Sequence, residues 1–301
     1  MANSRDIKRR IVGVKNTGKI TRAMEMISAV KMRKASASVT AIRPYAENTL
    51  AVLRQISVAL AGENHPLLTE RPITQELYIV VSSNRGLCGA FNAQIIKKIR
   101  QILKEDSGRV ASFITIGKKA EMSLRRMNQN ILASFPDLIA NPNSDGVRVV
   151  AQMATEEFKA GRVDRVVVIY TDYVSVMSQV VKVRALLPVT IKDTEKQVAN
   201  IDGLPGETVA EEQVTSEYLI EPSPNAVLEI LVPKLITMTV YHALLESRAS
   251  EEAARMMSMR NATDAAKEMT GDLTLAYNQL RQQKITQEIA ELSAGMAAVS
   301  K

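Results

Sequence analysis

The first candidate for chemistry is the turn from Ser83 to Ala90, which follows an aliphatic run and precedes a predicted helix. Backbone N–H groups at the start of a helix can bind phosphate, so a turn of this kind could hold a nucleotide. The turn has neither the GxGxxG nor the GxxxxGK(S/T) spacing of phosphate-binding loops. We therefore expect Gly86 and Gly89 to serve the geometry of the turn, and we predict no cofactor.

The other reactive residue types are too scattered to define a site. His65 and His242 have no cysteine or histidine at the spacing of metal ligands, so we predict no metal site. Cys88 is the only cysteine, which excludes an internal disulfide, and no histidine lies near it to form a catalytic pair. We expect Cys88 to be a small packing residue and predict no catalytic residue. Four acidic residues are expected on a solvated helix face: Glu251, Glu252, Glu268 and Asp272.

Positive charge is concentrated at the start of the chain. The 301 residues carry a formal net charge of +7, and residues 1–35 hold ten basic residues against two acidic ones. Such a segment could neutralise the phosphates of a nucleic acid or face an acidic protein surface, and salt would weaken either contact. Residues 1–44 contain no aromatic side chain for base stacking and no nucleic-acid motif. Both kinds of partner stay open at this point.

Both ends of the chain are predicted to be long helices. No proline interrupts residues 1–43 or 234–301, and helix-forming residues run continuously through both stretches. We expect the first helix over residues 5–60, with a kink or short break at Pro44, and the last helix to begin at Ser223-Pro224. At about 1.5 Å per residue, the C-terminal stretch alone could reach roughly 100 Å.

Both terminal helices carry stripes at the spacing of a coiled coil. On the C-terminal helix, steps of four and three residues collect side chains of which only Glu252 is charged. The predicted C-terminal seam is Leu245, Ala249, Glu252, Met256, Met259, Thr263, Ala266, Thr270, Leu273, Tyr277 and Leu280. The predicted N-terminal stripe is Ile7, Ile11, Val14, Gly18 and Thr21, and then, after a slip, Ile20, Met24, Ile27 and Val30.

Between the two helices the sequence alternates between strand and helix patterns, which indicates an α/β layer with helices on the sheet faces. Residues 178–189 are expected to add an antiparallel edge strand, residues 190–215 to form a polar loop, and residues 217–221 to be extended. Strands are predicted at 77–82, 110–116, 131–135 and 165–171, and helices at 90–104, 118–128 and 145–159.

Four segments of the sequence resemble the γ subunit of F-type ATP synthase. They are KRRIVGVKNTGKITRAMEMISAVKMRKA at residues 8–35, SSNRGLCGAFN at 82–92, ESRASEEAARMMSMRNATDAAKEM at 246–269 and LAYNQLRQQKITQEIAE at 275–291. They occur in the order of the family and cover both ends and the first strand-to-helix turn. In the middle of the chain, from about residue 110 to 215, the sequence matches the family in its pattern of strands and helices more than in its residues.

The resemblance implies an α/β fold class in which the terminal helices form a long antiparallel coiled coil and the centre forms a Rossmann-like α/β domain. The corresponding segments are the N-terminal helix at 1–60, the α/β foot domain at 75–215 and the C-terminal helix at 222–301. In this family the coiled coil enters the cavity of the α3β3 hexamer and the foot stays outside. The subunit acts as the rotor of the central stalk, coupling rotation of the membrane c-ring to sequential conformational changes of the catalytic β subunits, and is not itself catalytic.

The resemblance also implies partners and contact residues. The partners are the α3β3 hexamer, especially β, together with an ε subunit and the c-ring, with one copy per complex, no nucleic acid, and the membrane reached only through the c-ring. The location is the cytoplasmic face of the bacterial inner membrane. Contacts with β are expected at Lys19, Arg22, Met24, Arg85, Leu87, Cys88, Arg281, Gln282, Thr286 and Glu288, and contacts with the c-ring at Tyr218 and Glu221.

Two departures from the family pattern bear on this interpretation. Asn84 stands where many members have aspartate, which argues against a role for charge at that position. The chain lacks the dithiol insertion of photosynthetic members, since Cys88 is its only cysteine, and this favours a bacterial, non-photosynthetic enzyme. The alternative hypothesis is a coiled-coil scaffold or nucleic-acid-binding adaptor that uses the basic first helix, and an enzyme with a ligand at residues 86–89 is the third.

Overall fold

The computed structural model describes residues 4–59, 67, 69, 71–106, 108–189 and 223–299, without the side chains of 42–59, 224, 225, 228 and 297–299. The chain forms two compact units. One, the terminal helix pair, comprises Met1–Ser28 and Arg255–Lys301, and the other, the sheet unit, comprises Ala29–Ala254. These units cut across the three predicted segments, because parts of both long helices belong with the sheet. His65, Tyr218, Glu221 and the segments 190–215 and 217–221 lie outside the described residues.

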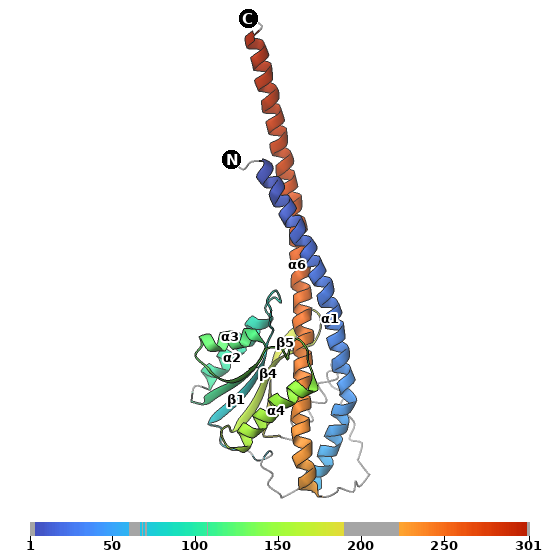
Figure 1. Ribbon diagram of the computed structural model, residues 1–301, viewed down its shortest axis with the longest axis vertical. Coiled ribbons are helices and arrows are strands. Elements are labelled where there is room, and N and C mark those ends of the chain that lie inside the picture. Colours follow the sequence, from blue (N-terminus) through green and yellow to red (C-terminus); the bar gives the residue numbers. More distant parts are fainter. Residues whose placement is uncertain are drawn as a thin grey trace. The chain divides into compact units, whose positions relative to one another are not determined.

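The sheet unit is built on a five-stranded sheet in the order β3-β2-β1-β4-β5 (Figure 1). The first four strands run parallel, and β5 is an antiparallel edge strand beside β4, as the sequence predicts. The strands are β1 (Gln75–Val81), β2 (Val110–Ile116), β3 (Asn130–Phe135), β4 (Arg165–Tyr173) and β5 (Gln179–Leu187). The helices between them are α2 (Phe91–Glu105), α3 (Lys118–Arg126) and α4 (Ser144–Lys159), all within a few residues of their predicted bounds.

Helices cover both faces of this sheet, and β1 shows why. Leu77, Ile79 and Val81 point to one face, while Tyr78 and Val80 point to the other, and all five are buried. The first face packs against α4 and the start of α6, and the second packs against α2 and α3. The continuous aliphatic runs in the sequence thus reflect strands that are buried on both faces.

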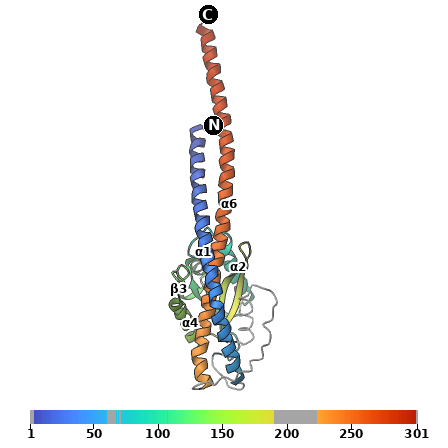
Figure 2. The ribbon, with the colours of Figure 1, turned by 90° about the vertical axis from the view of Figure 1, so that its right-hand side faces the viewer.

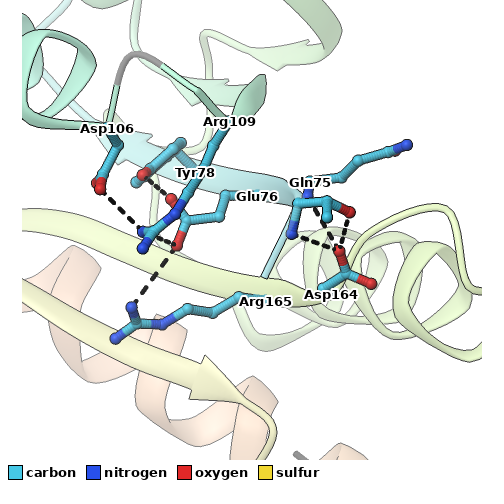
Figure 3. Close-up of polar contacts among 8 residues, drawn as sticks. Gln75, Glu76, Tyr78, Asp106, Arg109, Asp164 and Arg165 are labelled. Atoms are coloured by element: carbon cyan, nitrogen blue, oxygen red, sulfur yellow. Dashed lines mark hydrogen bonds and ion pairs between the residues drawn. The ribbon is translucent and has the colours of Figure 1, made fainter. Parts of the chain in front are cut away.

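Ion pairs and hydrogen bonds connect the amino-terminal ends of the central strands (Figure 3). The carboxylate of Glu76, only 2% exposed, lies 3.4 Å from Arg109 and 3.6 Å from Arg165, and it accepts a hydrogen bond from the Tyr78 hydroxyl. Burial, and then this bond with Glu76, raises the pKa of Tyr78 above its ordinary value. The beginnings of β1 and β4 and the residue that precedes β2 are therefore held to one buried carboxylate.

The two long helices are α1 (Ser4–Ala59) and α6 (Pro224–Val299). α6 begins where predicted: the backbone N–H of Ala226 donates to Ser223 Oγ at 3.3 Å, and Pro224 needs no such bond. α1 is helical throughout residues 4–59, so it has no break at Pro44. In both views α1 and the C-terminal part of α6 lie side by side in the terminal helix pair (Figures 1 and 2).

Candidate functional site: the terminal helix pair and the turn at the sheet edge

Small residues set the closeness of the terminal helix pair. The hydroxyls of Thr21 and Thr263 share a hydrogen bond of 2.7 Å across the pair. A Cβ added to Gly18 would lie 3.4 Å from the Cβ of Ala266, so the two backbones approach as closely as van der Waals contact permits. Moving from Gly18 to Thr21 on α1 moves from Ala266 to Thr263 on α6, which makes the pair antiparallel.

The seam predicted on α6 is confirmed. Every residue predicted in it is buried or half-buried, from Leu245 at 4% exposed through to Leu280. The register explains where burial stops, since Ile7 near the start of α1 is still buried at 8% exposed, whereas residues 281–296 of α6 are all exposed. α6 therefore continues past the start of α1 as a helix without a partner in the described part of the chain (Figure 1).

The stripe predicted on α1 is correct only to Thr21. The proposed continuation is wrong, because Ile20, Ile27 and Val30 are 61%, 55% and 63% exposed. Steps of four and three instead continue without a slip through residues that are buried or half-buried: Glu25, Ser28, Met32 and Ala35. Polar side chains occupy two of these seam positions, so hydrophobicity alone pointed to the neighbouring face. That face of α1 is an exposed apolar band.

The predicted contact residues on the helices lie mostly at the surface. Lys19 and Arg22 are exposed, and Met24 is half-buried beside the seam. All four predicted contact residues on α6 are exposed: Arg281, Gln282, Thr286 and Glu288. Within the helix, Lys284 lies 3.7 Å from Glu288, and Thr286 Oγ1 donates to the carbonyl of Gln282 at 3.0 Å.

The turn at residues 83–90 has an internal polar frame and an exposed tip. Asn92 Nδ2 donates to Ser83 Oγ at 2.7 Å and to Cys88 Sγ at 3.2 Å, and Cys88 is 2% exposed. This confirms that Cys88 is a packing residue. Arg85 is exposed, and Leu87 is 61% exposed at a φ of 62°, a conformation that costs a non-glycine residue energy.

Asn84 has a structural role that suits an amide. Its Nδ2 donates to the carbonyl of Pro136 at 2.6 Å, and its Oδ1 accepts from the backbone N–H of Lys118 at 3.0 Å. An aspartate could accept the second bond but could not donate the first at neutral pH. The departure from the family pattern thus ties the turn to the loops that follow β2 and β3.

The usual ligand position of this kind of sheet is filled by the chain itself. In doubly wound sheets, ligands bind at the carboxyl ends of the strands where the order reverses, which here lies between β1 and β4. α6 passes this point: its residues 232–244 pack in the first layer and Ala254 packs in the second. Between them Ser247 and Ser250 bond to Thr171 of β4. No group of three potential metal ligands occurs among the described residues.

Glu251 and Glu252 of α6 were predicted on a solvated face, although Glu252 was also predicted in the seam. Glu251 and Glu252 are 8% and 7% exposed, so the prediction of a solvated face is wrong for this pair. Lys31 of α1 lies 4.0 Å from Glu252, which means that this stretch of α6 is covered within the sheet unit. Glu268 and Asp272 are exposed, as predicted.

A buried polar cluster joins α6 to the edge of the sheet, and sequence reasoning missed it. Burial, and then a hydrogen bond with Asp172, raises the pKa of Glu246 to about 9. Burial, assisted by the charge of Arg184, lowers the pKa of His242 to about 4, so its 3.4 Å contact with Glu246 is not an ion pair at neutral pH. Burial alone would raise the pKa of Asp172, but hydrogen bonds with Glu246 and Lys182 hold it below its ordinary value. The only sequence signal was polar residues within and just after the apolar run at 227–245.

Comparison with known proteins identifies the class. The family model for ATP synthase matches residues 3–299, and none of the helices that the structure describes is long and apolar enough to cross a membrane. The chain is 40% identical to the ATP synthase gamma chain of Moorella thermoacetica and 38% identical to that of Heliobacterium modesticaldum. Both alignments span 299 residues, which is 99% of this chain and 100% of each relative. The chain therefore belongs to the ATP synthase gamma-chain family.

Solved structures agree on the fold. The mitochondrial ATP synthase of Euglena gracilis, in a structure of OSCP, F1 and the c-ring, contains a chain with a TM-score of 0.65 and 18% identity, covering 98% of this chain and 94% of that one. The central stalk and c-ring structure from Tetrahymena thermophila contains a chain with a TM-score of 0.58 and 24% identity, covering 81% and 99%. At these identities the likeness confirms the predicted combination of terminal helices and an α/β sheet.

Proposed function

We propose that this chain is the central-stalk rotor subunit of an F-type ATP synthase and couples rotation of the c-ring to sequential conformational changes of the catalytic β subunits. The observation that carries the proposal is the antiparallel seam that ends at Leu280 and leaves residues 281–296 of α6 exposed. A single helix of this length, with exposed side chains on all sides, suits a surrounding protein sleeve better than open water.

The residues proposed to contact β rest on the family resemblance, and all but Met24 of those on the two helices are exposed. Lys19 and Arg22 on α1 and Arg281 and Glu288 on α6 offer charged groups, to which we add Gln282 and Thr286. Met24 is half-buried and offers only part of its side chain. These groups differ around the helix pair, so each of three identical β subunits would meet a different surface and be biased towards a different nucleotide state.

The turn at the sheet edge supplies a second contact with β in this proposal. Arg85 and Leu87 form its exposed tip, and the buried Cys88 holds the turn in shape behind them. Contacts of Tyr218 and Glu221 with the c-ring rest on the family resemblance, because both residues lie outside the described part of the chain.

The remaining assignments complete the rotor. The partners are one α3β3 hexamer, an ε subunit and the c-ring, with one copy of this chain per complex and no catalytic residue of its own. The chain works at the cytoplasmic face of the bacterial inner membrane and touches the membrane only through the c-ring. Relatives from bacteria support this location.

Reconstitution tests the proposal. The purified chain, mixed with the α and β subunits, should assemble into an ATPase that turns a probe fixed to this chain. A correctly folded chain that stays outside the ring would contradict it. DNA affinity that depends on salt and survives in the assembled complex would instead favour the scaffold or adaptor hypothesis.

Met24→Lys tests one contact within the complex. A new positive charge at a surface that contacts β adds an attraction that must be broken at every step, so coupling should fall more than stability. The measurement is proton pumping per ATP hydrolysed, with thermal stability as the control. An unchanged ratio would remove Met24 from the contact set.

A further inference from the structure

We propose that Thr171 of β4, together with Ser247 and Ser250 of α6, forms the joint through which torque passes between the sheet and the long helix. This inference rests on the proposed rotor function and names where, within the chain, its load is transferred. If the c-ring turns the sheet unit and the hexamer resists at the far part of α6, the sheet must not slide along or around the helix.

The joint consists of directional hydrogen bonds to the backbone of one strand. The N–H of Thr171 donates to Ser247 Oγ at 2.9 Å, and Ser250 Oγ donates to the carbonyl oxygen of Thr171 at 3.2 Å. All three residues are fully buried. Ser247 and Ser250 are three positions apart, so they lie on the same face of α6.

The location of these bonds explains why the helix is needed there. β4 pairs with β1 from Arg165 to Ile169 and continues to Tyr173 beyond the end of that pairing. At Thr171 the strand has β5 on one side, opposite Val181, and the two serines of α6 bond both of its backbone polar groups. α6 thus takes the place of a neighbouring strand at this position. Buried backbone groups must be hydrogen-bonded, so displacing the helix would leave both without a partner.

Apolar packing on either side turns this bond pair into a fixed joint. Ala243 and Leu244 pack in the first layer of the sheet unit, one turn before Ser247, and Ala254 packs in the second layer, one turn after Ser250. Rotation of α6 about its own axis would slide these contacts past the sheet. Apolar contacts alone tolerate sliding, whereas the two hydrogen bonds have a required direction and resist it.

The joint is tested by comparing ATP hydrolysis in the α3β3 complex, where nothing resists the sheet, with proton pumping in the complete enzyme, where the c-ring does. Ser247→Ala and Ser250→Ala, singly and together, are introduced into this chain in the complete membrane-bound enzyme and in the α3β3 complex. Ser258→Ala is the matched control, a serine of the same helix beyond the sheet unit. We expect the α3β3 complex with the double variant to keep its ATPase rate within about twofold, because nothing there loads the sheet. ATP-driven proton pumping per ATP hydrolysed should fall at least threefold in the complete enzyme.

Each outcome decides the question. The proposed joint would be refuted if proton pumping and ATP hydrolysis fell together, or if the number of protons pumped per ATP stayed at the wild-type value. If the double variant does not assemble, the single variants, which each keep one bond, decide by the same ratio. Failure of the wild-type chain itself to assemble or to support pumping would contradict the rotor function, which the variants presuppose, and not the joint alone.

Discussion

Replacing Glu246 by glutamine should remove a fall in the stability of the sheet unit at alkaline pH. Residue Glu246 is 6% exposed, and burial followed by a hydrogen bond with Asp172 raises its pKa to about 9 from an ordinary value of 4.5. Between these values the folded chain binds one proton more than the unfolded chain. The free energy of unfolding therefore decreases with rising pH, by about 1.4 kcal/mol per pH unit.

His242 opposes this effect over part of the range. Its pKa is lowered from 6.5 to about 4, so between these values the folded chain binds one proton fewer and the unfolding free energy rises with pH. The two slopes cancel from about pH 4.5 to 6.5, and the slope due to Glu246 stands alone from there to about pH 9. The wild-type chain should lose about 3 kcal/mol between pH 6.5 and 8.5, at about 1.4 kcal/mol per unit.

Hydrogen exchange resolves this for the sheet unit alone. Protection of the β4 and α6 amides is compared between wild type and Glu246→Gln at each pH, so that the intrinsic exchange rate cancels. Protection in the variant should exceed that of wild type by a ratio that grows with pH, because glutamine resembles the protonated carboxyl and has no proton to lose. Glu288→Gln, at an exposed position of the same helix, should leave the ratio at one. A constant ratio for Glu246→Gln, or a variant less protected than wild type at pH 8.5, would show that Glu246 is ionised in the folded chain and refute the reasoning.

Further predictions concern the rest of the framework. Asp164 accepts hydrogen bonds from the side chain and backbone of Thr74 and from the backbone of Gln75, which lower its pKa, so its contribution should be present above about pH 4 and lost as pH falls below its ordinary value of 3.8. Asp164→Ala should cost about 1–2 kcal/mol at pH 7, measured by urea unfolding, and less at the acid limit, where the part due to ionisation is lost. Gly18→Leu should separate the helix pair and cost about 1–3 kcal/mol, because its Cβ would already be in contact with Ala266 at 3.4 Å and the rest of the side chain must push the helices apart. Gly13→Leu, with nothing within 4 Å, should instead raise helix stability by up to about 1 kcal/mol, and circular dichroism melting of both variants checks the contrast.

The sequence predicted the elements of this fold well, because long runs of one period leave few alternatives. The aliphatic runs of β1 and β4 are buried on both faces, and the steps of four and three on α6 run unbroken from Leu245 to Leu280. The antiparallel edge at β5 was also predicted. In each case local composition and tertiary packing favour the same structure.

The sequence failed where tertiary packing decides which helix face is covered. On α1 the seam continues through Glu25 and Ser28, whereas the apolar side chains of Ile27 and Val30 lie on the exposed face. A prediction based on hydrophobicity alone therefore selected the wrong stripe. On α6 the burial of Glu251 depends on what packs around it within the sheet unit, which no periodicity reports.

The polar cluster around Glu246 escaped prediction for the same reason. Its members come from three elements that are distant in sequence, with Asp172 on β4, Lys182 and Arg184 on β5, and His242 and Glu246 on α6. Only the docking of α6 at the sheet edge brings them together. The joint at Thr171 likewise depends on a helix that replaces a strand, an arrangement without a local sequence signature.

The most direct test of the account is whether the two ends of the chain can be locked to each other without stopping the motor. Thr21→Cys and Thr263→Cys are combined with Cys88→Ser, because the hydroxyls at these positions are 2.7 Å apart. In the assembled enzyme, oxidation should form a disulfide between the two introduced cysteines in high yield. ATP hydrolysis and proton pumping should continue at rates close to those of the reduced enzyme. Absence of the bond, or turnover that stops when it forms, would contradict an antiparallel pair that turns as one body.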